Sequence, residues 1–187
     1  MSKFFSSLLS FMLLTACAAP GGLLVSESAR AVGGNLFIED VGDDSFFLVL
    51  DGDITRDTAY FFQVMSELED LDGLVITQSP GGDLFAAHQI GREIAEKRMN
   101  TMVIAGCFSA CVDIFITGRQ RLIGSEATLG LHSMEDPELG FRIDQPYWAS
   151  FGFQRVNEAA YKVPFEDMWI IDAKEAKRLR LATEIIE

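Results

Sequence analysis

Residues 74–82 read Leu-Val-Ile-Thr-Gln-Ser-Pro-Gly-Gly, an apolar run that ends in a glycine turn. A short continuous apolar run bounded by turn residues is typical of a buried strand. Asp83 follows where a helix cap belongs, and apolar residues then recur at helical spacing to about Lys97. This stretch therefore predicts a strand, a tight turn and a helix, the repeating unit of a parallel sheet.

The same alternation continues on both sides of this unit. We expect strands at 46–50, 74–77, 101–105, 122–123, 128–131 and 183–186, and helices at 56–69, 83–97, 109–117 and 172–177. Three prolines interrupt residues 134–166, where we expect one helix near 147–161. The length of 187 residues suits one domain. The pattern predicts a single α/β domain over residues 35–187, built from βαβ units.

The composition is that of a globular protein with a surplus of acidic side chains. The chain is 49% hydrophobic and its net charge is −13. Binding of nucleic acid needs clustered Lys and Arg to contact phosphates, so this charge balance argues against a nucleic-acid partner.

The N-terminal residues predict export. Lys3 precedes an apolar stretch at 4–14 that is too short to span a bilayer comfortably, and the sequence Leu-Thr-Ala-Cys then ends at Cys17. This predicts a signal peptide at 1–16, and the four residues resemble the bacterial lipobox, whose cysteine becomes the lipidated first residue. The alternative is an ordinary signal peptide cleaved shortly after Cys17. Residues 17–34, rich in Ala, Gly and Ser, are then a tether between lipid and domain.

A second group of residues suits acyl transfer. Residues 106–111 (Gly-Cys-Phe-Ser-Ala-Cys) place Ser109 at the start of a helix, and His132 follows a short strand. A serine hydroxyl becomes a useful nucleophile when a base lies within reach and donors face the developing oxyanion. Gly82 allows close backbone approach to a carbonyl, and the N–H of Ala110 is an unpaired donor at the helix start. We predict Ser109 as nucleophile, His132 as base, and the Gly82 and Ala110 N–H groups as oxyanion hole.

These motifs resemble those of the ClpP proteolytic subunit and the wider ClpP/crotonase superfamily. Residues 46–54 resemble its first core strand and turn, 74–82 its oxyanion strand and 174–179 its closing helix, while Ser109 and His132 fall on its nucleophile and base. The resemblance implies the ClpP/crotonase-like βαβ superhelical fold and a serine peptidase. It also implies a peptide or unfolded protein as substrate and a possible homo-oligomer. No cofactor is expected.

The acid that would orient His132 is the least defined member of the predicted triad. By the resemblance, Asp167 lies about where the family places this acid, but one residue out of register. Glu166 and Asp172 are neighbouring alternatives. The segment between His132 and Asp167 is shorter than the family's handle helix, so we do not expect stacked double rings. Arg180 replaces the glycine that the family carries after its closing helix.

Two further polar residues stand in apolar surroundings. Asp113 follows Ser109 by one helical turn, and an unpaired carboxylate there would be costly to bury. We expect it to pair with Arg119 or Arg121, with an approach to the catalytic group as the alternative. His88, the other of the chain's two histidines, lies mid-helix and is expected to be structural or partly exposed.

Cys107 and Cys111 lie four residues apart. In an oxidising compartment they could form a disulfide, and two small buried thiols are the equal alternative. Their spacing does not indicate a zinc site, because neither a second cysteine pair nor a nearby histidine accompanies it. We expect no metal.

The sequence as a whole predicts an exported serine peptidase. We expect it on the periplasmic side of a bacterial cell envelope, held to a membrane through lipid on Cys17. The residue after Cys17 is alanine rather than aspartate, which slightly favours the outer membrane by resemblance to known sorting rules. The alternative function is an inactive peptide-binding or scaffolding module of the same fold. A crotonase-type acyl-CoA enzyme is a third, since it shares the two-donor hole.

Overall fold

One nine-stranded sheet runs through the residues that the computed structural model describes, which are 26, 28–42 and 45–187. Its main path runs β1-β2-β3-β4-β5-β6-β9, while β7 pairs with β5 and β8 pairs with β7. The strands are β1 (Arg30–Gly33), β2 (Leu36–Gly42), β3 (Ser45–Asp51), β4 (Leu71–Ser79), β5 (Asn100–Phe108), β6 (Arg121–Gly124), β7 (Thr128–Leu131), β8 (Trp169–Asp172) and β9 (Glu184–Ile186). The pairings from β3 through β6, β6 with β9 and β5 with β7 are parallel; the β1–β2, β2–β3 and β7–β8 pairings are antiparallel.

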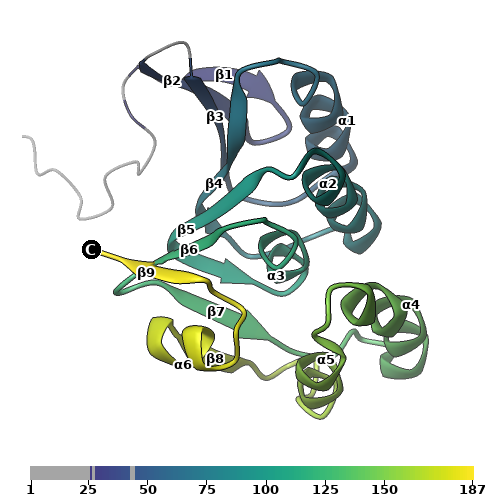
Figure 1. The fold of residues 1–187 in the computed structure, drawn as a ribbon. Coiled ribbons are helices and arrows are strands. Elements are labelled where there is room, and N and C mark those ends of the chain that lie inside the picture. Colours follow the sequence, from purple (N-terminus) through teal and green to yellow (C-terminus); the bar gives the residue numbers. More distant parts are fainter. Residues whose placement is uncertain (1–25, 27, 43–44) are drawn as a thin grey trace, which may run out of the picture.

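The first three helices cover one side of this sheet, and α4 and α5 pack together beyond α3 (Figure 1). The helices are α1 (Arg56–Met65), α2 (Leu84–Lys97), α3 (Ala110–Phe115), α4 (Pro137–Ser150), α5 (Gln154–Ala160) and α6 (Ala173–Arg178). Phe62, Ile76 and Phe115 are among the fully buried side chains of the core between helices and strands. No helix in this part of the chain is long and apolar enough to cross a membrane.

The predicted α/β fold class is confirmed, and the local signals explain why. Thr55 caps α1 through a reciprocal bond with Thr58, and the Asp83 side chain accepts from the Ala86 N–H at the start of α2. Each predicted strand and each predicted helix outside 134–166 has a counterpart, with ends that differ by a few residues. The antiparallel strands β1, β2 and β8 were not predicted from the sequence.

The helix predicted at 147–161 is wrong in its bounds. The structure has α4 and α5 instead, separated at Gly152, whose φ of +84° ends helical geometry. Pro137 sits in the first turn of α4, where its missing N–H costs nothing, and Asp136 caps that turn. Pro146 lies inside α4. Pro164 lies in the loop between α5 and β8. The three prolines therefore mark a helix start, an interior position and a loop, and the break between α4 and α5 is at the glycine.

The predicted signal peptide and Cys17 lie outside the described residues. The predicted tether, 17–34, overlaps β1, so strand pairing begins before the expected domain boundary at residue 35. Arg180, which stands where the family carries glycine, has a φ of +64°. The backbone thus keeps the left-handed conformation that a glycine would adopt without steric cost.

Candidate active site

The glycine turn after β4 lies directly against the turn that carries Ser109. Gly81 and Gly82 have φ angles of +99° and +141°. A Cβ atom added to Gly81 would lie 2.8 Å from Ser109 Cβ, so only glycine permits this approach. The Ile54 N–H donates to the Gly81 carbonyl at 2.7 Å, and the Asp83 N–H donates to the Ile54 carbonyl at 2.8 Å. These bonds fix the turn from its outer side.

Ser109 occupies a sharp turn between β5 and α3. Its backbone angles, φ +53° and ψ −133°, lie outside the regions that non-glycine residues favour. The Ser109 N–H donates to the Gly130 carbonyl of β7 at 2.8 Å, which ties the turn to the strand before His132. Such strained backbone persists where the surroundings over-determine it, and it gathers at functional sites. Ser109 is therefore held, half-buried, at the tip of a sharp turn, a geometry suited to a nucleophile.

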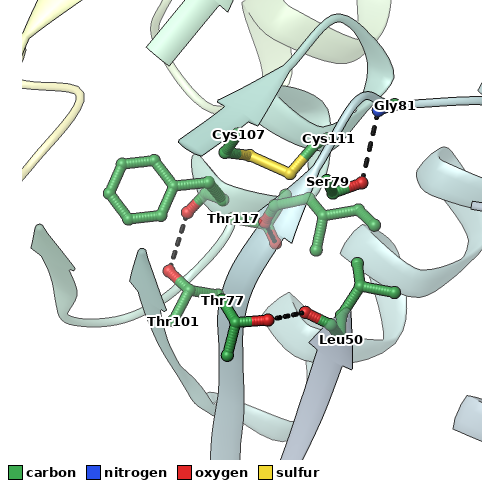
Figure 2. Close-up of a disulfide and its surroundings, with 10 residues drawn as sticks. Leu50, Thr77, Ser79, Gly81, Thr101, Cys107, Cys111 and Thr117 are labelled. Atoms are coloured by element: carbon green, nitrogen blue, oxygen red, sulfur yellow. Dashed lines mark hydrogen bonds between the residues drawn. A yellow bond between two sulfur atoms is a disulfide. The ribbon is translucent and has the colours of Figure 1, made fainter. Parts of the chain in front are cut away.

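A disulfide joins Cys107, at the end of β5, to Cys111 in the first turn of α3. Both side chains are fully buried. Figure 2 shows this bridge beside Ser79, whose Oγ accepts from the Gly81 N–H at 3.2 Å. The cross-link spans the Ser109 turn, so strand, nucleophile and helix are connected covalently as well as by backbone hydrogen bonds.

The two backbone donors predicted for the oxyanion hole remain available. Within the residues the structure describes, neither the Gly82 N–H nor the Ala110 N–H donates to a protein acceptor. Gly82 and Ala110 both line the same cavity as Ser109. Two unpaired donors beside a hydroxyl can stabilise a developing oxyanion.

This cavity has a volume of about 470 Å³. His132 lines it together with Ser109, so the structure brings the predicted nucleophile and base to one pocket. Trp148, Tyr161 and Phe165 supply aromatic walls. The pocket therefore combines a hydroxyl, an imidazole, two backbone donors and an apolar lining.

Among the residues that the structure describes, no carboxylate accepts a hydrogen bond from His132 Nδ1. Its Nδ1 is buried and has no hydrogen-bond partner within the described chain. The ring instead lies 5.3 Å from that of Phe165, centre to centre, and the Ser133 N–H donates to the Val163 carbonyl at 2.9 Å. The segment that carries Asp167 thus lies alongside His132, but the structure does not bring the Asp167 carboxylate to the imidazole.

The three predicted acids near the closing helix have other positions. Asp167 and Glu166 are exposed. Asp172 caps α6, where its carboxylate accepts from the Glu175 N–H at 2.7 Å. None of the three makes a hydrogen bond or ion pair to His132 in the structure.

The expected pairing of Asp113 with Arg119 or Arg121 is wrong. The Asp113 carboxylate accepts from Trp148 Nε1 and lies 3.9 Å from His88 Nε2. Arg121 instead donates to backbone carbonyls of the α6–β9 connection, among them that of Leu181 at 2.7 Å. Arg121 begins β6 and donates to nearby backbone carbonyls, whereas Asp113 contacts His88 of α2 and Trp148 of α4.

His88 is buried, with 2% of its surface exposed, so of the two expected alternatives the structural position agrees with the structure and the partly exposed one does not. Its Nε2 lies 3.1 Å from Asp144 Oδ1, in an ionic contact without the alignment of a good hydrogen bond. Its ring stacks on that of Tyr147 at 3.7 Å, and the Tyr147 hydroxyl donates to the Asp113 carbonyl at 2.9 Å. His88, Asp113 and Asp144 therefore form one buried charged cluster.

The cluster changes the proton affinity of its members. Burial raises the pKa of Asp113 from 3.8 to about 6, and the nearby Asp144 charge adds to this, while His88 and Trp148 oppose it. Burial lowers the pKa of His88, but its contacts with Asp113 and Asp144 outweigh burial and raise it above 6.5. One ligand atom from each of the three residues lies within 4.8 Å of the others, a spacing that a divalent cation could also use.

Sequence reasoning missed Asp144, Trp148 and Tyr161. All three lie in 134–166, where the prolines obscured the helical pattern. The Tyr161 hydroxyl donates to Asp144 Oδ2, a contact that joins the end of α5 to α4. One signal of this cluster was present in the sequence: Asp113 and His88 are polar residues within apolar runs, which indicates that they need buried partners.

Comparison with known proteins supports the fold. No protein-family model and no curated protein matches the chain. Among solved structures, the chain is similar to the ClpP protease catalytic domain from Plasmodium falciparum, with a TM-score of 0.60 and 21% identity over 74% of this chain and 83% of that one. A ClpP1 variant from Listeria monocytogenes has a TM-score of 0.58 and 18% identity, covering 75% and 91% of the two chains.

A second group of similar structures consists of crotonase-type enzymes. The enoyl-CoA hydratase from Thermoplasma volcanium has a TM-score of 0.60 and 14% identity, covering 82% of this chain and 72% of that one. At such identities the likeness concerns the fold. The chain therefore has the fold that ClpP proteases and crotonase-type enzymes share.

Proposed function

We propose that this chain is a serine peptidase in which Ser109 is the nucleophile and His132 the base. The observation that carries the proposal is the strained backbone of Ser109, placed beside two unpaired N–H donors in a pocket that His132 also lines. A packing serine would need neither the strain nor the free donors. The protease neighbours of the same fold support this choice of chemistry.

The arrangement suits a two-step hydrolysis. The peptide carbonyl oxygen lies between the Gly82 and Ala110 N–H groups, and Ser109 Oγ attacks the carbonyl carbon while His132 takes its proton. His132 then gives that proton to the leaving amine, which produces an acyl-enzyme and a free amine. Water, deprotonated by His132, releases the acid and restores Ser109.

We assign Asp167 as the positioning residue for His132. The segment that carries Asp167 lies beside His132. The Ser133 N–H donates to the Val163 carbonyl, and the Phe165 ring contacts the His132 ring. A bound peptide that orders this exposed segment would bring the carboxylate to the unpartnered Nδ1. Apo sites commonly have looser catalytic contacts than occupied ones.

We also propose that the protein works outside the cytoplasm, held to the outer membrane through lipid on Cys17. The disulfide supports export, because structural disulfides persist in oxidising compartments. Metabolic labelling with a palmitate analogue tests the anchor: wild type should be labelled and Cys17→Ser should not.

A fluorophosphonate probe tests the proposed chemistry. Wild type should be labelled at Ser109, while Ser109→Ala and His132→Ala should lose the label and Ser125→Ala, at an exposed serine outside the pocket, should keep it. Asp167→Asn should slow labelling roughly tenfold or more, and the neighbouring Glu166→Gln should not. A well-folded wild type that takes no label would favour a peptide-binding module instead.

A further inference from the structure

The floor of the active-site pocket is acidic. Asp113 and Asp144 line the same cavity as Ser109, although they are only 4% and 7% exposed. Their remaining exposed surface faces this cavity. The serine peptidase chemistry proposed above makes no use of either carboxylate.

Each carboxylate is held in place by a donor from α4 or α5. Trp148 Nε1 donates to Asp113 Oδ1, and the Tyr161 hydroxyl donates to Asp144 Oδ2. Asp144 Oδ1 is buried and has no hydrogen-bond partner within the described residues. The nearest polar atom to this oxygen is His88 Nε2, at 3.1 Å, in an ionic contact without an aligned hydrogen bond.

The charges around the floor do not balance. Among the described residues, His88 is the one basic side chain in contact with the two carboxyl groups, so a single imidazole faces two acids. Arg56, at the pocket mouth, has a side chain that is 91% exposed and lies 3.5 Å from Asp83. Arg92 lies over the Tyr147 ring, 5.5 Å from its centre, and forms no ion pair with either carboxylate. A buried negative charge without a counter-charge favours a cation from outside.

We infer that this pocket binds the side chain of a lysine or arginine residue on the N-terminal side of the cleaved bond. The inference rests on the proposed function for the position of the peptide. When the carbonyl of the cleaved bond accepts from the Gly82 and Ala110 N–H groups, the side chain of the same substrate residue enters the cavity that Asp113 and Asp144 line. The aliphatic stem packs against Trp148, and the cationic head reaches the carboxylates. The protein's net charge of −13 also attracts basic peptides.

A divalent cation is the rival occupant of the cluster. His88, Asp113 and Asp144 could each offer one ligand atom. The observations favour the substrate side chain, because His88 already lies in ionic contact with Asp144 and is not among the residues that line the cavity. The raised proton affinity of His88 also opposes metal binding, which requires a neutral imidazole.

Peptide binding to the Ser109→Ala variant tests the inference without any need for turnover. Calorimetry would compare two hexapeptide amides that differ only in their last residue, arginine or its neutral analogue citrulline. We expect the arginine peptide to bind roughly tenfold more tightly or better, as a charged hydrogen bond to a buried carboxylate requires. Equal affinities would overturn the inference.

Variants locate the source of the preference. Asp144→Asn and Asp113→Asn, each in the Ser109→Ala background, should bring the two affinities to within about threefold of each other. Asp83→Asn should keep the full preference, because Asp83 lies at the mouth and asparagine can replace it as a helix cap. Circular dichroism checks folding. If an aspartate variant fails to fold, the comparison of the two peptides on the Ser109→Ala variant, which keeps both carboxylates, still decides the question. A preference that Asp144→Asn and Asp113→Asn both keep in full overturns the inference.

Metal analysis and the labelling experiment separate the remaining outcomes. The protein could bind one equivalent of a divalent ion tightly and show no preference for arginine after EDTA has removed that ion. This result would overturn the inference in favour of a metal site. Probe labelling of Ser109 with equal peptide affinities would keep the peptidase and reject the basic pocket. A preference for arginine in a protein that takes no label would keep the pocket and reject the peptidase.

Discussion

The chain's two histidines have opposite surroundings. His88 is buried between two carboxylates and stacks on an aromatic ring. His132 is half-buried in the pocket with Ser109, and its Nδ1 has no partner in the described chain. A carboxylate beside a histidine is therefore a poor guide to the base in this molecule. The two acids beside His88 raise the pKa of its imidazole, and an imidazole that already holds a proton cannot accept the proton of a serine.

The largest expected effect is on the rate of Ser109 acylation, which should depend far more on His132 than on His88. His132→Ala should slow acylation of Ser109 by about 10³-fold or more, because it removes the group that accepts the proton. His88→Gln should slow acylation by less than about tenfold when the measurement is made well below its unfolding temperature. Stopped-flow kinetics with a fluorogenic ester provide both rates. Comparable losses in the two variants would contradict the division of roles.

The second prediction concerns the stability of the buried cluster. His88→Gln should lower the free energy of unfolding by about 3 to 5 kcal/mol, because Asp113 and Asp144 then face each other without a counter-charge. His132→Gln is the matched control and should change it by less than about 1 kcal/mol, since no carboxylate depends on that ring. Urea unfolding followed by tryptophan fluorescence measures both. Equal losses would mean that His88 is not a counter-charge.

The difference between the histidines also shows where sequence reasoning succeeds. The strand at 74–77, the caps Thr55 and Asp83 and the short helix after Ser109 were predicted because each depends on neighbouring residues in the chain. Local hydrogen bonds and side-chain periodicity determine such elements. Ser109 and His132 share a pocket because they follow β5 and β7, two strands that pair in parallel, so that their ends meet.

The cluster around His88 could not be predicted, because its members come from three helices. Asp113 was recognised as a costly burial, but its partners lie far away in sequence, in α2 and α4. The arginines nearest in sequence were the wrong choice. Helix direction decides which side chains meet, and α4 lies in the segment that the prolines made hardest to interpret.

The third prediction uses pH to examine the same cluster. The pKa of Asp113 is raised from 3.8 to about 6, so the folded protein holds this proton more tightly than the unfolded chain. That contribution to stability is present below pH 3.8 and is lost as pH rises through about 6. His88, whose pKa is raised above 6.5, loses its contribution at still higher pH, in the same direction.

Urea titrations between pH 4 and pH 8 measure this effect. The stability of wild type relative to Asp113→Asn should fall by about 2 to 3 kcal/mol as pH rises from about 4 to 7, since each pKa unit corresponds to about 1.4 kcal/mol. A constant difference across this range would show that Asp113 does not titrate with a raised pKa.

The smallest predicted effect concerns the disulfide that spans the Ser109 turn. Replacing Cys107 and Cys111 together with alanine should lower the free energy of unfolding by about 2 kcal/mol, because the cross-link closes a short loop in the unfolded chain. Acylation should also slow, since the bridge holds the strained turn of Ser109, while the pH dependence attributed to His88 and Asp113 should persist. Denaturation and acylation rates, with and without reductant, measure these effects in wild type, and the double variant should not respond to reductant. If reduction altered the pH dependence but left acylation unchanged, the disulfide would stabilise the His88 cluster rather than the nucleophile, and the two regions would not be independent.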